Sequence, residues 1–246
     1  MGFLRIDGAS YTYPPDETVV NGVDWAIDQG AFHCLVGRSG CGKTTLLKLA
    51  AGLLPPSRGA VHIQDAPVTE PSPQVGFVFQ NPTLLDWLTA MENVLLPVSL
   101  KRRPRVADRG RAAELLALVG LAEYAGRHPR ELSGGQQSRV AIARALVNEP
   151  LVLLMDEPFA ALDAITREEL QADLLRLCAS RRTTVLFVTH DIAEAVYLAD
   201  RVAVMAEGRV RDTLDIDLAR PRAPDLRYSP RFNELCRAAR QAMDAA

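Results

Sequence analysis

The feature that most constrains the fold is a glycine-rich segment at residues 37–44, with the sequence GRSGCGKT. It fits the pattern G-x-x-x-x-G-K-[ST] of loops that bind phosphate groups. An apolar run of strand length, residues 32–36, precedes it, and residues 43–53 follow with apolar side chains at helical spacing. A strand, a phosphate-binding loop and a helix in this order predict an α/β chain that binds a nucleotide.

The residue types of this loop suit bound phosphates. Glycines let backbone N–H groups converge on phosphate oxygens, and the following helix presents the positive end of its dipole. Lys43 supplies a compact charge for the β- and γ-phosphates, and Thr44 offers a hydroxyl to Mg²⁺. Only three of the 28 basic residues are lysines, so a lysine at this position favours the phosphate-binding interpretation over a chance turn.

A second apolar run ends in two acidic residues. Residues 151–155 are typical of a buried strand, and Asp156 and Glu157 follow directly. Asp156 suits Mg²⁺, directly or through water, and Glu157 could polarise an attacking water. The alternative is a buried strand that ends in a structural aspartate, and a phosphate-binding loop in the same chain disfavours it.

The order of expected elements is α/β, then helical, then α/β again. Strands are expected at residues 3–7, 19–27, 32–36, 61–63 and 75–79, and residues 89–148 are mostly helical in pattern. Strands at 151–155, 184–188 and 202–205 then alternate with helices at 164–178 and 192–198. This alternation predicts a parallel sheet covered by helices. From residue 218 the chain is rich in proline and arginine, and it ends in a helix-like stretch at 231–243.

Composition narrows the class of partner. Of the 246 residues, 48% are hydrophobic and 24% charged, as in ordinary globular proteins, and the formal net charge is −2. This balance does not indicate nucleic acid as a general partner. The four cysteines have no metal-ligand spacing, and we expect free thiols. A basic run at residues 101–105 is either a phosphate or lipid-headgroup contact or, more simply, a solvated connection between helices.

A third motif is more specific. Residues 132–136 read LSGGQ at the start of an expected helix, which is a second anion-binding geometry in the same chain. With it, residues 3–216 resemble the ATP-binding cassette (ABC) family, whose signature is LSGGQ. Other motifs follow in the family's order: Gln80 in the Q-loop, Leu162 and Asp163 in the D-loop, and His190 as the switch histidine.

The resemblance implies a P-loop NTPase (RecA-like) α/β core with an antiparallel β subdomain and an inserted α-helical subdomain. It implies an ATPase domain at residues 1–216, the helical subdomain at about 89–150, and a short tail at 217–246. Implied catalytic residues are Glu157, His190 and Gln80, and implied metal ligands are Thr44, Gln80 and Asp156. Implied nucleotide contacts are Tyr13, Gly37, Arg38, Ser39, Gly40, Cys41, Gly42, Lys43, Thr44, Thr45, Ser133, Gly134, Gly135, Gln136 and Asp163. Tyr11 is the alternative to Tyr13 for stacking on adenine.

The family resemblance also implies cofactors and partners. ATP and Mg²⁺ would bind between two copies paired head to tail, with Lys43 from one and Ser133 and Gly135 from the other. The chain would lie peripherally on the cytoplasmic face of the cell membrane, bound to a transmembrane permease. A periplasmic or lipoprotein solute-binding protein would take part indirectly, and no nucleic acid is expected.

Two segments narrow the function further. Residues 84–94 and the tail around 217–232 are similar to ATPases of nitrate, sulfonate, taurine and bicarbonate importers, with Asp86 in place of their usual proline. The leading hypothesis is therefore the energy-coupling ATPase of a small-solute importer. The alternatives are a soluble cassette ATPase without a permease and, less well supported, a small-molecule kinase, which would leave LSGGQ unexplained.

The segment after Gln80 is the expected permease dock. It carries Leu84, Leu85, Trp87 and Leu88, more apolar surface than a loop needs. Either these side chains pack inside the helical insert, or they form the lip of a groove that receives a short helix of a membrane subunit.

Overall fold

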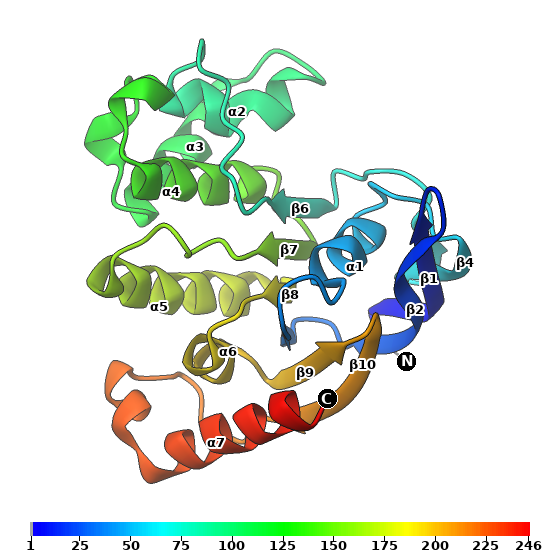
Figure 1. The fold of residues 1–246 in the computed structure, drawn as a ribbon. Helices are drawn as coiled ribbons and strands as arrows, with labels where there is room; N and C mark the ends of the chain where they lie inside the picture. Colours follow the sequence, from blue (N-terminus) through cyan, green and yellow to red (C-terminus); the bar gives the residue numbers. More distant parts are fainter. Residues whose placement is uncertain (1) are drawn as a thin grey trace. The chain divides into compact units, whose positions relative to one another are not determined.

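The computed structural model describes residues 2–246. The chain forms two compact units, one from residues 1–72 and Leu175–Ala246 and the other from Pro73–Leu174 (Figure 1). Helix α5 (Ala164–Arg181) carries the chain from the second unit into the first. Within residues 2–246, every helix falls short of the length and hydrophobicity that a bilayer-spanning helix needs.

The first unit contains an antiparallel sheet and a mostly parallel one. The antiparallel sheet has the order β2-β1-β4-β5, from β1 (Leu4–Tyr13), β2 (Glu17–Ile27), β4 (Arg58–Ile63) and β5 (Ala66–Pro67). In the other, β3 (Phe32–Val36) lies parallel to both β8 (Thr184–Val188) and β9 (Arg201–Ala206), and β10 (Arg209–Asp215) is antiparallel to β9. All residues of β3 and β8 are buried, as expected of parallel strands covered on both faces.

Three helices complete the first unit. Helix α1 (Lys43–Ala50) follows β3, α6 (Ile192–Leu198) follows β8, and α7 (Pro230–Ala245) packs against α6 and β9. The expected α1 boundary, residue 53, is wrong by three residues. Gly52 has φ +70° and its N–H donates to Leu49 O, so a left-handed glycine ends the helix before Pro55 is reached.

The second unit contains a strand pair and a helical bundle. Strands β6 (Val75–Val78) and β7 (Val152–Asp156) are parallel. Helices α2 (Ala90–Ser99), α3 (Val106–Leu118) and α4 (Gly134–Leu146) pack against one another (Figure 1). Short 3₁₀ turns at Ala122–Tyr124 and Pro129–Glu131 join α3 to α4. The expected α/β class, antiparallel subdomain and helical insert are confirmed.

The residues after 216 are packed into the first unit. Arg222 is 7% exposed and donates to the carbonyls of Val196, Tyr197 and Ala199 at the end of α6, while the Tyr197 hydroxyl donates to Arg222 O. A 3₁₀ turn (Pro224–Tyr228) then leads to α7, whose apolar face is buried. The edge strand β10 was not expected from sequence, because its exposed residues are mainly polar.

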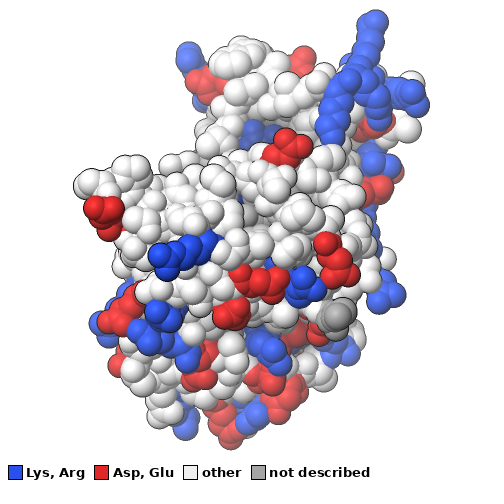
Figure 2. All heavy atoms as spheres, turned by 90° about the vertical axis from the view of Figure 1, so that its right-hand side faces the viewer, with Lys and Arg blue, Asp and Glu red and all other residues white. Residues whose placement is uncertain are grey.

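Both signs of charge are interspersed over most of the face seen in Figure 2, and a group of basic side chains stands out at its upper right.

In the basic run at residues 101–105, Arg102 forms two hydrogen bonds with Asp108, at 2.6 and 2.9 Å, and the Arg105 N–H donates to the same carboxylate. These donors hold the pKa of Asp108 well below its usual range. Part of the run therefore shapes the turn between α2 and α3.

His33, in the strand that leads into the phosphate loop, generates a prediction. Its ring stacks on Trp25 with centroids 5.7 Å apart, and burial together with Arg201 lowers its pKa to about 4. Between pH 6.5 and 4 the unfolded chain therefore binds a proton that the folded chain does not, and stability is lost as pH falls. From pH 7 to 5 the wild type should lose about 2 kcal/mol more unfolding free energy than His33→Phe.

Urea unfolding at the two pH values measures this difference. His128→Gln, which removes an exposed histidine outside β3, is measured alongside as the control. Equal pH dependence of the wild type and His33→Phe would show that His33 is protonated normally in the folded chain.

Candidate functional site

The phosphate-loop pattern folds as a tight turn between β3 and α1. Lys43 is 7% exposed, and its Nζ donates to the carbonyls of Gly37 at 2.8 Å and Arg38 at 2.9 Å. The same Nζ lies 3.7 Å from Cys41 Sγ. The lysine thus spans the loop from inside and places an ammonium charge within it.

Helix α1 begins without a side-chain cap. Its N-cap is Gly42, with φ +105°, and its first turn contains no acidic residue. A Cβ on Gly42 would lie 2.4 Å from Val19 O, so only glycine fits here. The first amides of a helix have no partner within the helix, and at α1 no side-chain cap or acidic residue of the first turn competes for them. This arrangement suits an anionic ligand.

Tyr13 ends β1 beside the first turn of α1. Its hydroxyl is 3.5 Å from Thr45 Oγ1, whereas Tyr11 meets the Tyr13 ring edge-on at 4.8 Å between centroids. Of the two tyrosines considered for adenine, Tyr13 is therefore the one that reaches the phosphate loop.

The acidic end of β7 lies in the second unit. Asp156 is 5% exposed, and Glu157 has φ +46°, a backbone conformation that is uncommon outside glycine. Gln80 Nε2 donates to Glu157 Oε2 at 3.4 Å. The structure thus brings Gln80 and Glu157 together, although they are 77 residues apart in sequence.

The LSGGQ motif forms the start of α4. Ser133 is the N-cap: its hydroxyl accepts from Gln136 N at 3.2 Å, and the Gln136 side chain accepts from Ser133 N at 2.8 Å. This reciprocal pair is a capping box, so both residues have a structural role beside any contact with phosphate. Gly134 is exposed at the same helix end and Gly135 is half-buried.

Asp163 and His190 lie at the starts of two other helices. Asp163 Oδ1 accepts from Thr166 N at 3.0 Å, and this hydrogen bond lowers the pKa of Asp163. His190 is exposed between β8 and α6, and the next residue, Asp191, caps α6 by accepting from Glu194 N at 3.1 Å. Each helix start presents its expected site residue at the surface.

The expected site residues therefore fall into two groups. The first unit carries Tyr13, residues 37–45 and His190, and the second carries Gln80, residues 133–136, Asp156, Glu157 and Asp163. Within each group, the structure places the residues at or next to strand ends and helix starts.

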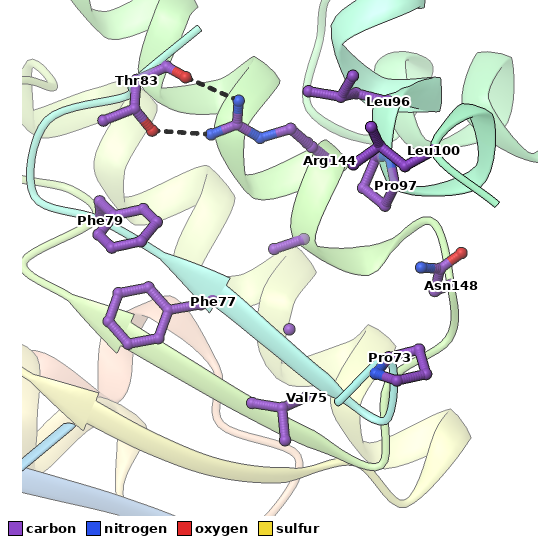
Figure 3. Close-up of a pocket in the computed structure, with 12 residues that line it drawn as sticks. Pro73, Val75, Phe77, Phe79, Thr83, Leu96, Pro97, Leu100, Arg144 and Asn148 are labelled. Atoms are coloured by element: carbon purple, nitrogen blue, oxygen red, sulfur yellow. Dashed lines mark hydrogen bonds between the residues drawn. The ribbon is translucent and has the colours of Figure 1, made fainter. Parts of the chain in front are cut away.

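Two side chains that the sequence analysis missed organise the segment after Gln80. Asn93 on α2 is fully buried; its Nδ2 donates to Leu85, Leu88 and Thr89 carbonyls, and its Oδ1 accepts from Leu85 N. Arg144 on α4 donates to Pro82 and to Thr83, and Figure 3 shows the bonds to Thr83. In the sequence, Arg144 is a charged residue among the apolar positions of its helix. This was the only available sequence signal of its role.

The expected docking segment is neither core nor fully exposed. Leu84, Leu85 and Leu88 are half-buried, and Trp87 is 72% exposed. Beside it lies a pocket of about 310 Å³, lined mainly by Phe77, Phe79, Thr83, Leu96, Pro97, Leu100 and Arg144 (Figure 3). Leu100 at its edge is 79% exposed.

Comparison with known proteins gives close relatives. Residues 20–160 match the ABC transporter family. The bicarbonate transport ATP-binding protein of Synechocystis sp. is 44% identical over 91% of this chain and 82% of its own length. The nitrate import ATP-binding protein of Synechococcus elongatus is 43% identical over 95% of this chain and 89% of its own length.

A solved structure agrees with this relationship. A dimeric ATP-binding cassette in a post-hydrolysis state, bound to ADP and Pi, superposes with a TM-score of 0.81. It is 34% identical and covers 88% of this chain and all of that one. The chain therefore belongs to the ABC transporter family, of which it is an ATP-hydrolysing cassette.

Proposed function

We propose that this cassette is the energy-coupling subunit of an importer for a small anion of the nitrate or bicarbonate class. The observation that carries the proposal is the similarity of nearly the whole chain to a bicarbonate-transport and a nitrate-import subunit. The cassette would comprise residues 1–216 with the helical insert at about 89–150, and the tail would complete it. It would work peripherally at the cytoplasmic face of the membrane.

The phosphate loop would hold the triphosphate. Lys43 would exchange its contacts with the loop carbonyls for the β- and γ-phosphates, and the backbone amides at the uncapped start of α1 would bind the remaining oxygens. The ring of Tyr13, placed beside Thr45, would offer a flat face to adenine.

The available donors fit Mg²⁺. Thr44 offers a hydroxyl, Gln80 an amide oxygen and Asp156 a carboxylate, all hard oxygen ligands. One carboxylate together with substrate phosphates is the usual protein contribution to a magnesium site of this kind. Bound there, Mg²⁺ would supply charge neutralisation for the phosphates.

Hydrolysis would use Glu157 as the general base. Glu157 directly follows the last residue of β7 in a left-handed backbone conformation, and Gln80 donates to it at 3.4 Å. Glu157 would take a proton from the attacking water, and Gln80 and His190 would orient that water and the γ-phosphate.

Two copies would complete each site. Ser133, Gly134, Gly135 and Gln136 of one copy would face the γ-phosphate bound by the other, with the positive end of the α4 dipole toward it. Asp163, exposed at the start of α5, would communicate between the sites. Such pairing is self-complementary, as a two-fold dimer requires.

The permease would dock on the pocket beside the 82–89 segment. The apolar walls of the pocket and the exposed side chains of Trp87 and Leu100 match the apolar face of a short helix. Gln80 stands at the start of the same segment, so a change at the γ-phosphate would reach the docked partner through a few residues.

Replacing Glu157 tests its assignment as the general base. Glu157→Gln keeps the shape of the side chain but cannot accept a proton, so ATP hydrolysis should fall by at least about 10²-fold while ATP binding persists. Phosphate release and equilibrium ATP binding measure the two properties. Glu169→Gln, an exposed change on α5, should leave both unchanged. Near-normal turnover of Glu157→Gln would show that another residue is the base.

Charged substitutions on the pocket surface test the proposed permease dock. Trp87→Glu and Leu100→Glu place charge on exposed apolar side chains, so folding and ATP hydrolysis by the isolated cassette should be retained. Uptake of labelled nitrate or bicarbonate by cells carrying these variants should be lost, because an unpaired charge at an apolar interface is costly. Val106→Glu, at a residue 88% exposed outside the pocket, is the matched control. Normal uptake by both variants would exclude this surface as the dock.

A further inference from the structure

The turn that follows Gln80 contains a strained residue. Thr83 has φ +46°, in the left-handed region that β-branched side chains strongly disfavour. Such a conformation persists only where surrounding contacts impose it. The turn therefore needs a restraint from outside its own sequence.

Arg144 is that restraint. Its two terminal nitrogens donate to Pro82 O at 2.7 Å, Thr83 O at 2.9 Å and Thr83 Oγ1 at 3.1 Å, so the guanidinium holds the turn by three hydrogen bonds. Figure 3 shows the two bonds to Thr83. Within residues 2–246 these are its only hydrogen bonds, and it has no carboxylate partner. Burial also lowers the pKa of Arg144, which is consistent with a cation that serves the backbone rather than an acid.

Helix α4 holds the same stretch of chain at a second point. A Cβ on Gly76, in β6, would lie 2.6 Å from Ala145 O, so the strand and the helix meet backbone to backbone. Residues 144 and 145 of α4 thus fix both the strand that leads to Gln80 and the turn that leaves it. Gln80, between these two fixed points, donates to Glu157.

We propose that Arg144 is a positioning residue for ATP hydrolysis, which holds the strained turn at Thr83 so that Gln80 stays against Glu157. The proposal rests on the functions proposed above for Gln80 and Glu157. Arg144 lies on the helix whose first residues are Gly134 and Gly135, so one rigid element would connect the signature end to the turn after Gln80. Its loss would let Thr83 relax to negative φ and move Gln80.

The test separates positioning from mere stability. Arg144→Met keeps the length and apolar stem of the side chain but removes all three donors. In the isolated cassette, kcat for MgATP should fall at least about fivefold, the range expected when one strained residue relaxes. KM should change less than kcat, because Lys43 and the start of α1, which hold most of the proposed triphosphate contacts, do not touch Arg144.

The decisive variant is the double change. Glycine adopts positive φ without strain, so Thr83→Gly should make the turn without the clamp. Thr83→Gly alone should lower kcat less than about twofold. In the Thr83→Gly background, adding Arg144→Met should again lower kcat less than about twofold. A residue that only stabilised the fold would not show this rescue.

Controls make every outcome decisive. Arg111→Met removes another arginine that donates to a backbone carbonyl, in this case Val147 O just after the last residue of α4. This variant should keep the wild-type kcat. If Arg144→Met is insoluble, Arg144→Lys, which keeps the charge but loses the fork, replaces it in the same cycle. Unchanged kcat in a folded variant, or an undiminished loss in the Thr83→Gly background, would overturn the proposal. Glu157→Gln is measured alongside. If Glu157→Gln stays active, the assignment of Glu157 as the base has failed; if it is inactive while Arg144→Met keeps wild-type kcat, only the role of Arg144 has failed.

Discussion

The proposed nucleotide site depends on the close approach of the phosphate loop to two other backbone segments. A Cβ on Gly37 would lie 2.2 Å from Met205 O, and one on Gly42 would lie 2.4 Å from Val19 O. Because these carbons are absent, the loop packs directly on β9 and on β2, and Lys43 ties it from inside. The uncapped start of α1 is thereby held at one place, where its amides can meet an anion.

In the second unit, side-chain hydrogen bonds hold the turns that carry the proposed site residues. Asn93 and Arg144 together hydrogen-bond the backbone of residues 82–89, and Ser133 and Gln136 cap the start of α4. The same helix therefore presents the signature residues and grips the turn after Gln80. In the proposed function, a phosphate contact at the start of α4 would reach the segment beside the apolar pocket by this route.

The sequence predicted most of the fold but only part of the site. Continuous apolar runs identified β3, β7 and β8, because strands buried on both faces show no alternation. The exposed strand β10 carries no such signal. The hydrogen bonds from Arg144 to Thr83 and from Gln80 to Glu157 were also beyond prediction, because they join residues 61 and 77 positions apart in the sequence. Motif spacing names residues, but only packing shows which of them touch.

The central claim is that neither copy of the chain has a complete site. Mixing Lys43→Ala with Ser133→Arg tests it most directly, because each variant should be inactive alone while a mixed dimer retains one intact site. With random pairing and independent sites, ATPase activity should return to about a quarter of the wild-type value. ATP-driven dimerisation of the mixture, scored in the same samples, detects mixed dimers even if the two sites are coupled. A mixture with neither activity nor dimers would contradict the composite site.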